Sequence, residues 1–514
     1  MPTMQRTVLL SGNVVDGYGE APFVGDVIVA DGRIEAIVPL GSRPAGGYDA
    51  DVVDATGLVV APGFVDIHCH SDLTRFAYPD AESRITQGIT TEIIGNCGMS
   101  AAPTGGDAAG LAEIIATIDV TPDQPRPWAS VADWLSALDS SPSAANVAAL
   151  VGHGSARHAA APGRGTNLTS AELSALVAEI DAALDAGCVG VSLGLMYAPG
   201  ESATRDELAA VAAAVARRDG LFAAHLRDYD ARALDGSISE LAAVAGDART
   251  QISHLRATHA NGRFVETLAR IDRLRGDQDI AADCYPYIAG HTTLLQLLPS
   301  EIRAAGTAAA LALEPKVIAQ LLREAGWNAD QIIVMKAAAT PDAVGASPAS
   351  QPDPWTWLAN ILLANNALVD VAVQSGAYAD VDLALQTAWV TIGSDGTALS
   401  AEHRASAPHP RSWGTFPAAF RRMRALGVSL PTAVRRMSVA SAERVGIPSG
   451  LRAGASADIV VFSEEELDAR ATFAAPALPS IGIRDVYVNG IAVQQHGRST
   501  GARPGRLRRK EHAL

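Results

Sequence analysis

The stretch GFVDIHCHSD, residues 63–72, places two histidines one residue apart at the end of an apolar run that follows a Pro62-Gly63 turn. Side chains alternate between the two faces of a β-strand, so His68 and His70 point to one face while Cys69 points to the other. One strand face therefore carries two ring nitrogens that can serve as ligands. The ends of the other strands must show whether these nitrogens belong to a metal site.

Seven further short, β-branched runs alternate with Ala- and Leu-rich helical segments along the rest of the chain. This alternation is typical of parallel strands that are connected by helices. The eight expected strands are residues 63–70, 90–98, 146–154, 187–195, 221–228, 250–257, 279–287 and 389–397. Eight such strands predict an α/β protein with a TIM-like (β/α)8 barrel, whose chemistry lies where the strands end.

The two ends of the chain have a different sequence pattern from this middle part. Short strands broken by Gly and Asp turns occupy the start and return at 457–463 and 483–497. We therefore expect a small β-sandwich domain built from residues 1–60 and 446–514, beside a barrel formed by residues 61–445. The long interval between the last two barrel strands exceeds one crossover helix, so residues from about 288 to 375 are expected to form an inserted lid.

Composition excludes several classes of function. The chain has 514 residues, 48% of them hydrophobic, and a net charge of -16, which disfavours binding to nucleic acid or to anionic membranes. Its start lacks a cleavage-site pattern and no window reaches about 18 apolar residues, so we expect a cytoplasmic protein. The four cysteines are too widely spaced to suggest a disulfide framework. The oligomeric state stays open.

Polar residues that can bind metal end most of the expected barrel strands. They are His68 and His70 on the first, Cys97 on the second, His153 on the third, His225 on the fifth, His254 on the sixth and Asp395 on the eighth. A lone strand-end histidine is more often a hydrogen-bonded core residue, but several that converge with a cysteine and an aspartate favour a metal. Imidazole, thiolate and carboxylate ligands suit Zn²⁺.

The remaining histidines and cysteines carry weaker signals. Cys69, Cys188 and Cys284 are expected to be small core residues. Six histidines are expected at the surface or in loops: His158, His259, His403, His409, His496 and His512. The roles of His291 and of His153 stay open, apart from an expected position of His153 at the barrel mouth.

The paired histidines, the later single histidines and the aspartate of TIGSDG resemble the amidohydrolase superfamily. Within it, five motifs resemble the D-aminoacylase, or N-acyl-D-amino-acid deacylase, family: GNCG (95–98), GLMYAPG (194–200), SHLRA (253–257), DCYPYIAGHTTL (283–294) and HPRSWGTFP (409–417). The resemblance extends over essentially the full chain. It implies hydrolysis of the amide bond of small-molecule N-acyl-D-amino acids, which yields a carboxylate and a free D-amino acid.

The same resemblance implies the roles of individual residues. Cys97, His225 and His254 would hold one tightly bound Zn²⁺, and His68, His70 and Asp395 a weaker second position. The expected strand at 187–195 has no lysine, the residue that bridges two metals in many binuclear relatives, so Cys97 is a plausible replacement. Asp395 would act as general base towards a metal-activated water and then protonate the leaving amine.

A free carboxylate on the substrate needs cationic or hydroxyl donors near the metal. Arg256, on the same strand face as His254, is suited to this task, and the family pattern adds Tyr197, Tyr287 and Arg411. Two alternatives stay open. One is an amidohydrolase that acts on a cyclic amide, like a hydantoinase or dihydroorotase, or that deaminates its substrate. The other is a catalytically inactive barrel that serves as an assembly scaffold.

Overall fold

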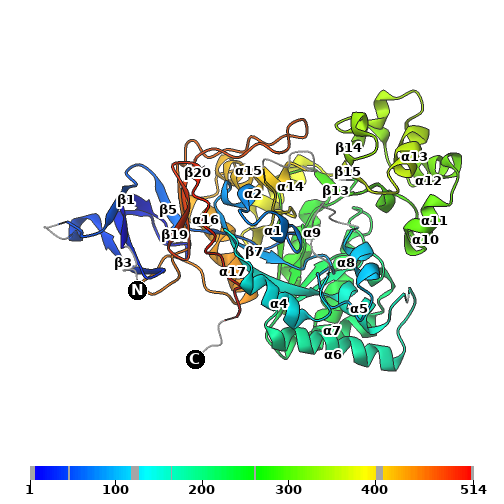
Figure 1. Cartoon of the computed structure of the whole chain (residues 1–514), viewed down its shortest axis with the longest axis horizontal. Helices are drawn as coiled ribbons and strands as arrows, with labels where there is room; N and C mark the ends of the chain where they lie inside the picture. The colour runs from blue at the N-terminus through cyan, green and yellow to red at the C-terminus, as the bar shows by residue number, and fades with distance from the viewer. Residues whose placement is uncertain are drawn as a thin grey trace.

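The computed structural model describes residues 6–43, 47–116, 127–163, 165–259, 262–400 and 409–510. Figure 1 shows three parts: a β-rich part at one end, a central barrel wrapped by helices, and a small α/β part at the opposite end. No helix among the described residues is both long and apolar enough to cross a membrane.

The central part is a parallel sheet of eight strands that confirms the predicted (β/α)8 barrel. Its strands are β6 (Phe64–Asp66), β7 (Ile89–Ile94), β8 (Asn146–Gly152), β9 (Gly190–Gly194), β10 (Leu221–His225), β11 (Arg249–Ile252), β12 (Ile280–Cys284) and β16 (Val390–Ile392). A bridge between Cys69 and Gly396 brings the first strand to the last and nearly closes the barrel. The strands are shorter than expected because the polar residues that follow them belong to the connecting loops.

Helices surround this barrel and bury its apolar outer face (Figure 1). They are α1 (Thr74–Ala77), α2 (Glu82–Ile85), α3 (Ala108–Ile115), α4 (Val131–Ser140), α5 (His153–Ala160), α6 (Ser170–Ala186), α7 (Arg205–Ala216), α8 (Leu234–Ala245), α9 (Phe264–Leu274), α14 (Tyr378–Gln386), α15 (Arg411–Ala425), α16 (Leu430–Met437) and α17 (Val439–Val445). The longest, α6, begins with a capping box between Thr169 and Glu172 and ends at Gly187 in the left-handed conformation.

The two ends of the chain contribute to one nine-stranded sheet. Its strands are β1 (Thr7–Val14), β2 (Phe23–Ala30), β3 (Arg33–Pro39), β4 (Asp51–Asp54), β5 (Val59–Pro62), β17 (Ile459–Phe462), β18 (Ile483–Val488), β19 (Ile491–Gln495) and β20 (Arg498–Ser499). Strand β17 pairs with β5 in antiparallel register, which joins the carboxyl-terminal strands to the amino-terminal ones. The tail then returns to the barrel, where Leu507 bridges to Val147.

The part of the chain between β12 and α14 forms a separate small unit, which we call the lid. Three antiparallel strands, β13 (Ala289–Thr293), β15 (Val369–Gln374) and β14 (Ile332–Ala337), form its sheet in that order. Its helices are α10 (Ser300–Ala304), α11 (Thr307–Leu311), α12 (Pro315–Glu324) and α13 (Pro354–Ala364). The lid has an apolar core of its own, so it can stand beside the barrel as a compact unit.

Candidate metal centre

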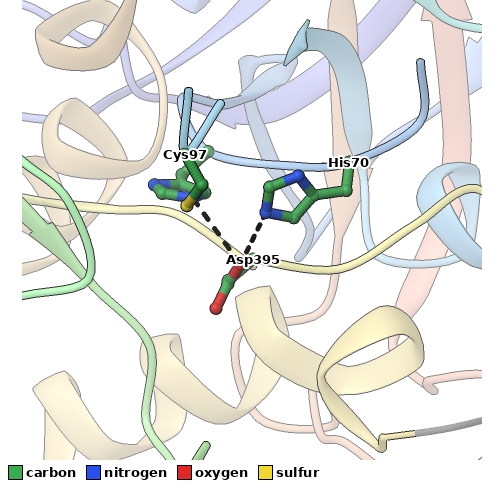
Figure 2. Close-up of side chains that lie close together, drawn as sticks. His70, Cys97 and Asp395 are labelled. Atoms are coloured by element: carbon green, nitrogen blue, oxygen red, sulfur yellow. Dashed lines mark hydrogen bonds and ion pairs between the residues drawn. The ribbon is translucent and has the colours of Figure 1, made fainter. Parts of the chain in front are cut away.

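The loops at the carboxyl ends of the barrel strands bring the six predicted metal ligands together. His68 and His70 follow β6, Cys97 follows β7, His225 ends β10, His254 follows β11, and Asp395 follows β16. None of the six is more than 8% exposed to solvent. Figure 2 shows the Cys97 sulfur, the His70 ring and the Asp395 carboxylate directed towards one another from separate segments.

These donors form two overlapping groups that share Cys97. One contains Cys97, His225 and His254, and the other contains His68, His70, Cys97 and Asp395, with all donor atoms of a group within 4.8 Å of one another. The Cys97 Sγ lies 3.5 Å from His225 Nδ1 and 3.6 Å from His254 Nε2. Sulfur and nitrogen ligands of a tetrahedral zinc are about 3.6 Å apart. The first group therefore fits zinc in its chemistry and in its sulfur–nitrogen distances, while its two ring nitrogens lie 2.9 Å apart.

The protonation states of Cys97 and His225 also suit metal binding. Burial alone would raise the pKa of the Cys97 thiol, but the charge of His68 and hydrogen bonds with His225 and His254 outweigh it and hold that pKa well below its usual value. Burial lowers the pKa of His225 to about 4, so its imidazole is neutral. By contrast, burial raises the pKa of the Cys284 thiol to about 12. Thiolate and neutral imidazole are the forms that bind metals.

Asp395 links the second group to an arginine. Its Oδ1 lies 2.9 Å from His70 Nε2, and its Oδ2 accepts a 2.5 Å hydrogen bond from Arg411 Nη1. Burial opposes ionisation of this carboxyl, but Arg411 and His70 dominate and hold the pKa of Asp395 well below its usual value. The Asp395 backbone N–H donates to His68 O at 2.7 Å, which ties the two strand ends together.

A cavity of about 240 Å³ opens beside these residues and is lined by three of the residues expected to bind the substrate, Tyr197, Arg256 and Arg411. The Tyr197 ring lies 4.7 Å from the His225 ring, measured between centroids. Arg256 Nη1 donates to the Tyr285 hydroxyl at 2.7 Å. The guanidinium carbons of Arg256 and Arg411 lie 5.8 and 5.7 Å from the Tyr285 ring centroid, so one tyrosine supports both cations.

Tyr287, the fourth residue expected to bind the substrate, does not line this cavity. Its ring lies 5.3 Å from the ring of His409, and it lines a narrow cleft behind Arg256 instead of the cavity. His409 lies in the loop before α15, as expected, but it is 1% exposed and so is not at the surface. Its Nδ1 accepts from the Arg411 N–H at 2.9 Å, so His409 shapes the start of α15.

Four other histidines are placed as follows. His291 lines the cavity from lid strand β13, and burial, helped by Arg411, holds its pKa well below the usual value, so the ring is neutral. His153 begins α5 with its Nε2 2.8 Å from Glu207 Oε1, and it does not line the cavity. The prediction for His158 was wrong, because this residue belongs to α5 and is buried, with its Nε2 3.3 Å from Asp107 O. His259 reaches the cavity rim. His403 and His512 lie outside the described residues.

Sequence reasoning missed two lid residues that line the cavity, Arg303 and Trp327. Arg303 Nη1 donates to Met196 O at 2.9 Å and to Gln296 Oε1 at 3.2 Å, while its buried Nε has no hydrogen-bond partner among the described residues. The Trp327 ring lies 5.3 Å from the His259 ring. Only the prediction of a lid pointed to this region, because no motif there marks single residues.

A barrel with paired histidines after its first strand and an aspartate after its last defines the amidohydrolase class, and a model of the amidohydrolase family matches residues 51–173. N-acyl-D-aspartate deacylase from Alcaligenes xylosoxydans xylosoxydans is 32% identical to this chain, with 98% of this chain and 95% of that protein covered. The chain belongs to the N-acyl-D-amino-acid deacylase, or D-aminoacylase, family.

Solved structures agree with this assignment. N-acyl-D-glutamate deacylase from Bordetella bronchiseptica, complexed with zinc and a phosphonate mimic of the tetrahedral intermediate, has a TM-score of 0.82 at 33% identity and covers 98% of this chain and 100% of its own. A D-aminoacylase described with a binuclear metal centre, one-metal activation and second-metal attenuation has a TM-score of 0.82 at 28% identity, with coverages of 98% and 99%.

Proposed function

We propose that this protein hydrolyses the amide bond of N-acyl-D-amino acids and releases a carboxylate and a free D-amino acid. The observation that carries the proposal is one cavity that combines a Cys97, His225 and His254 donor set, the ionised Asp395 and two arginines. The relatives support it, because they include deacylases of N-acyl-D-aspartate and N-acyl-D-glutamate, the latter with zinc.

Different residues would have different roles in the reaction. A zinc ion held by Cys97, His225 and His254 would polarise the amide carbonyl and make a water molecule more acidic. Asp395 accepts the proton of the attacking water and later passes it to the leaving nitrogen. Because Arg411 keeps the pKa of Asp395 low, the carboxylate is ionised before attack and gives up the proton readily afterwards.

The substrate carboxylate would bind to the two cavity arginines. Arg256 and Arg411 face the cavity over the same Tyr285 ring, and Tyr197 supplies a hydroxyl beside them. Guanidinium groups can bind a carboxylate through two parallel hydrogen bonds. This arrangement favours an open-chain acyl-amino acid with a free carboxylate over a neutral cyclic amide.

We further propose that the two metal positions differ in affinity. The Cys97, His225 and His254 position would be the tight one, because a thiolate and two imidazoles converge there with no competing cation. The His68, His70 and Asp395 position would be weaker, because Arg411 competes with a metal for the Asp395 carboxylate. Cys97 belongs to both donor groups and would bridge the two positions when both are filled.

A deacylation screen tests the proposal. Zinc-loaded protein is incubated with N-acetyl-D- and N-acetyl-L-amino acids that carry acidic, apolar and basic side chains, with hydantoin and dihydroorotate as cyclic controls. We expect release of free amine from D-amino acid derivatives only. Preferential hydrolysis of a cyclic amide or of the L-series would contradict the proposal, and hydrolysis of none of them would support the scaffold alternative.

The lid arginine Arg303 is expected to select acidic substrate side chains, because it adds a third cation to a cavity whose other two would bind the substrate carboxylate. A hydrogen bond to a charged group contributes about 1.5–3 kcal/mol, so Arg303→Ala should lower kcat/KM for N-acetyl-D-aspartate or N-acetyl-D-glutamate about 10- to 100-fold. N-acetyl-D-leucine should be affected far less. Arg323→Ala, at an exposed lid arginine near Asp353, is the control. Equal losses for all three substrates would refute this role.

A further inference from the structure

Two buried, oppositely charged residues lie behind the candidate metal centre and do not line its cavity. Asp66 ends β6, two residues before His68, and Arg84 belongs to α2; both are fully buried. Arg84 Nη1 donates to Asp66 Oδ2 at 3.0 Å. We call this pair the Arg84–Asp66 clamp. A buried ion pair is by itself weak evidence that its residues stabilise the fold. The position of this pair behind the metal centre therefore needs an explanation other than stability.

The clamp holds the backbone on both sides of Asp395. Asp66 Oδ1 accepts a hydrogen bond from the Ser394 N–H at 2.8 Å, and Arg84 Nη1 donates to Ser394 Oγ at 2.8 Å. Arg84 Nη2 donates to Thr397 O at 2.9 Å. The residue before Asp395 and the second residue after it are therefore bound to the same guanidinium group.

The same guanidinium also holds the first turn of α15. Arg84 Nη2 donates to Ser412 O at 2.5 Å, and Gln87 Nε2 donates to the same oxygen at 2.9 Å. Ser412 follows Arg411 directly, and its Oγ accepts from the Thr397 N–H at 3.2 Å. The segments that carry Asp395 and Arg411 are thus joined to each other and to the clamp.

The conformation of the Asp395 loop shows why such support is needed. Asp395 has a φ of 54°, in the left-handed region that residues with a side chain seldom adopt. A Cβ at the neighbouring Gly396 would lie 3.0 Å from Arg84 Nη2 and 2.9 Å from Ser412 Cα. The loop therefore crosses directly over the guanidinium group, in close contact with the start of α15.

We propose that Arg84 and Asp66 are positioning residues that hold Asp395 and Arg411 in register at the metal centre. Neither touches the cavity; they act through the loop at 394–397 and through Ser412. The inference rests on the proposed function, in which Asp395 moves the proton. Displacement of a reacting group by about 1 Å can lower the rate about 100-fold, so loss of the clamp should affect catalysis more than folding.

Two variants test the clamp. Arg84→Lys keeps the positive charge opposite Asp66 but cannot reach Asp66, Thr397 and Ser412 together. Ser394→Ala removes one hydroxyl, which accepts from Arg84 Nη1 and the Gly396 N–H and donates to Asp66, and it leaves the ion pair in place. We expect kcat to fall about 10- to 100-fold in Arg84→Lys and about tenfold in Ser394→Ala, with zinc content unchanged. We also expect faster amide hydrogen exchange in a peptide spanning 390–400, measured without substrate.

Arg436→Lys is the matched control. Arg436 is equally buried and also donates to backbone carbonyls, at 2.6 Å to Val390 O and 3.3 Å to Ala384 O, but it supports the opposite end of β16. Its variant should lose thermal stability while kcat is retained. The clamp role is refuted if amide hydrogen exchange at 390–400 is unchanged in folded Ser394→Ala. It is also refuted if, across all three variants, the loss of kcat is simply proportional to the loss of melting temperature. If the wild-type protein is inactive, the proposed function is refuted instead. The amide hydrogen exchange measurement then still tests whether Arg84 and Asp66 hold the 390–400 segment.

Discussion

Asp395→Asn is expected to lower kcat for an N-acetyl-D-amino acid by about 10²- to 10⁴-fold, the range that general acid–base catalysis contributes. Asparagine keeps the shape of the side chain but cannot accept the proton of the attacking water or return it to the leaving nitrogen. The effect should be large because the wild-type carboxyl is ionised, with a pKa held well below its usual value by Arg411 and His70 against the effect of burial.

Steady-state kinetics and zinc analysis of the same preparation separate chemistry from metal binding. Since Asp395 lies outside the Cys97, His225 and His254 group, the variant should retain the tightly bound zinc. Asp380→Asn is the matched control, because Asp380 is also a buried aspartate but lies in α14, outside the cavity. Near-normal turnover by Asp395→Asn would remove this residue from the mechanism, and parallel loss of zinc and activity would make it chiefly a ligand.

The barrel and the convergence of the donors could be predicted because both follow from local rules. Alternating buried strands and helices indicate a parallel barrel, and every strand end in such a barrel faces the same rim. It follows that residues as far apart as His68 and Asp395 can be grouped once each is recognised at a strand end. No such rule predicts which individual aromatic and cationic residues line the cavity.

The sequence does not predict positions that depend on contacts between distant segments, such as those of His409 and Tyr287. His409 is a loop residue, as the sequence indicates, but its ring is buried beside those of Tyr287 and His291. Tyr287 matches a family motif, but Tyr285 two residues earlier supports Arg256 and Arg411. The ion pair between Arg411 and Asp395 also joins separate segments. Its partners become evident only when α15 is placed against the β16 loop.

Cys97→Ala is expected to abolish retention of zinc under mild chelation, whereas the wild-type protein keeps about one zinc per chain. Cys97 is the one donor common to both groups, and its low thiol pKa means that the thiolate is already present at neutral pH. Alanine would leave only His225 and His254 as ligands in this group, too few for a tetrahedral site. Because the metal polarises the amide carbonyl, deacylation should be lost together with the zinc.

Cys284→Ala provides the matched control for this substitution. Cys284 is also buried at the end of a barrel strand, but burial raises the pKa of its thiol to about 12, so it remains protonated and belongs to neither donor group. Both variants are dialysed against the same chelator, and their zinc is measured by mass spectrometry. We expect Cys284→Ala to hold as much zinc as the wild type. If Cys97→Ala does so as well, the tight position must be assigned to the His68, His70 and Asp395 group instead.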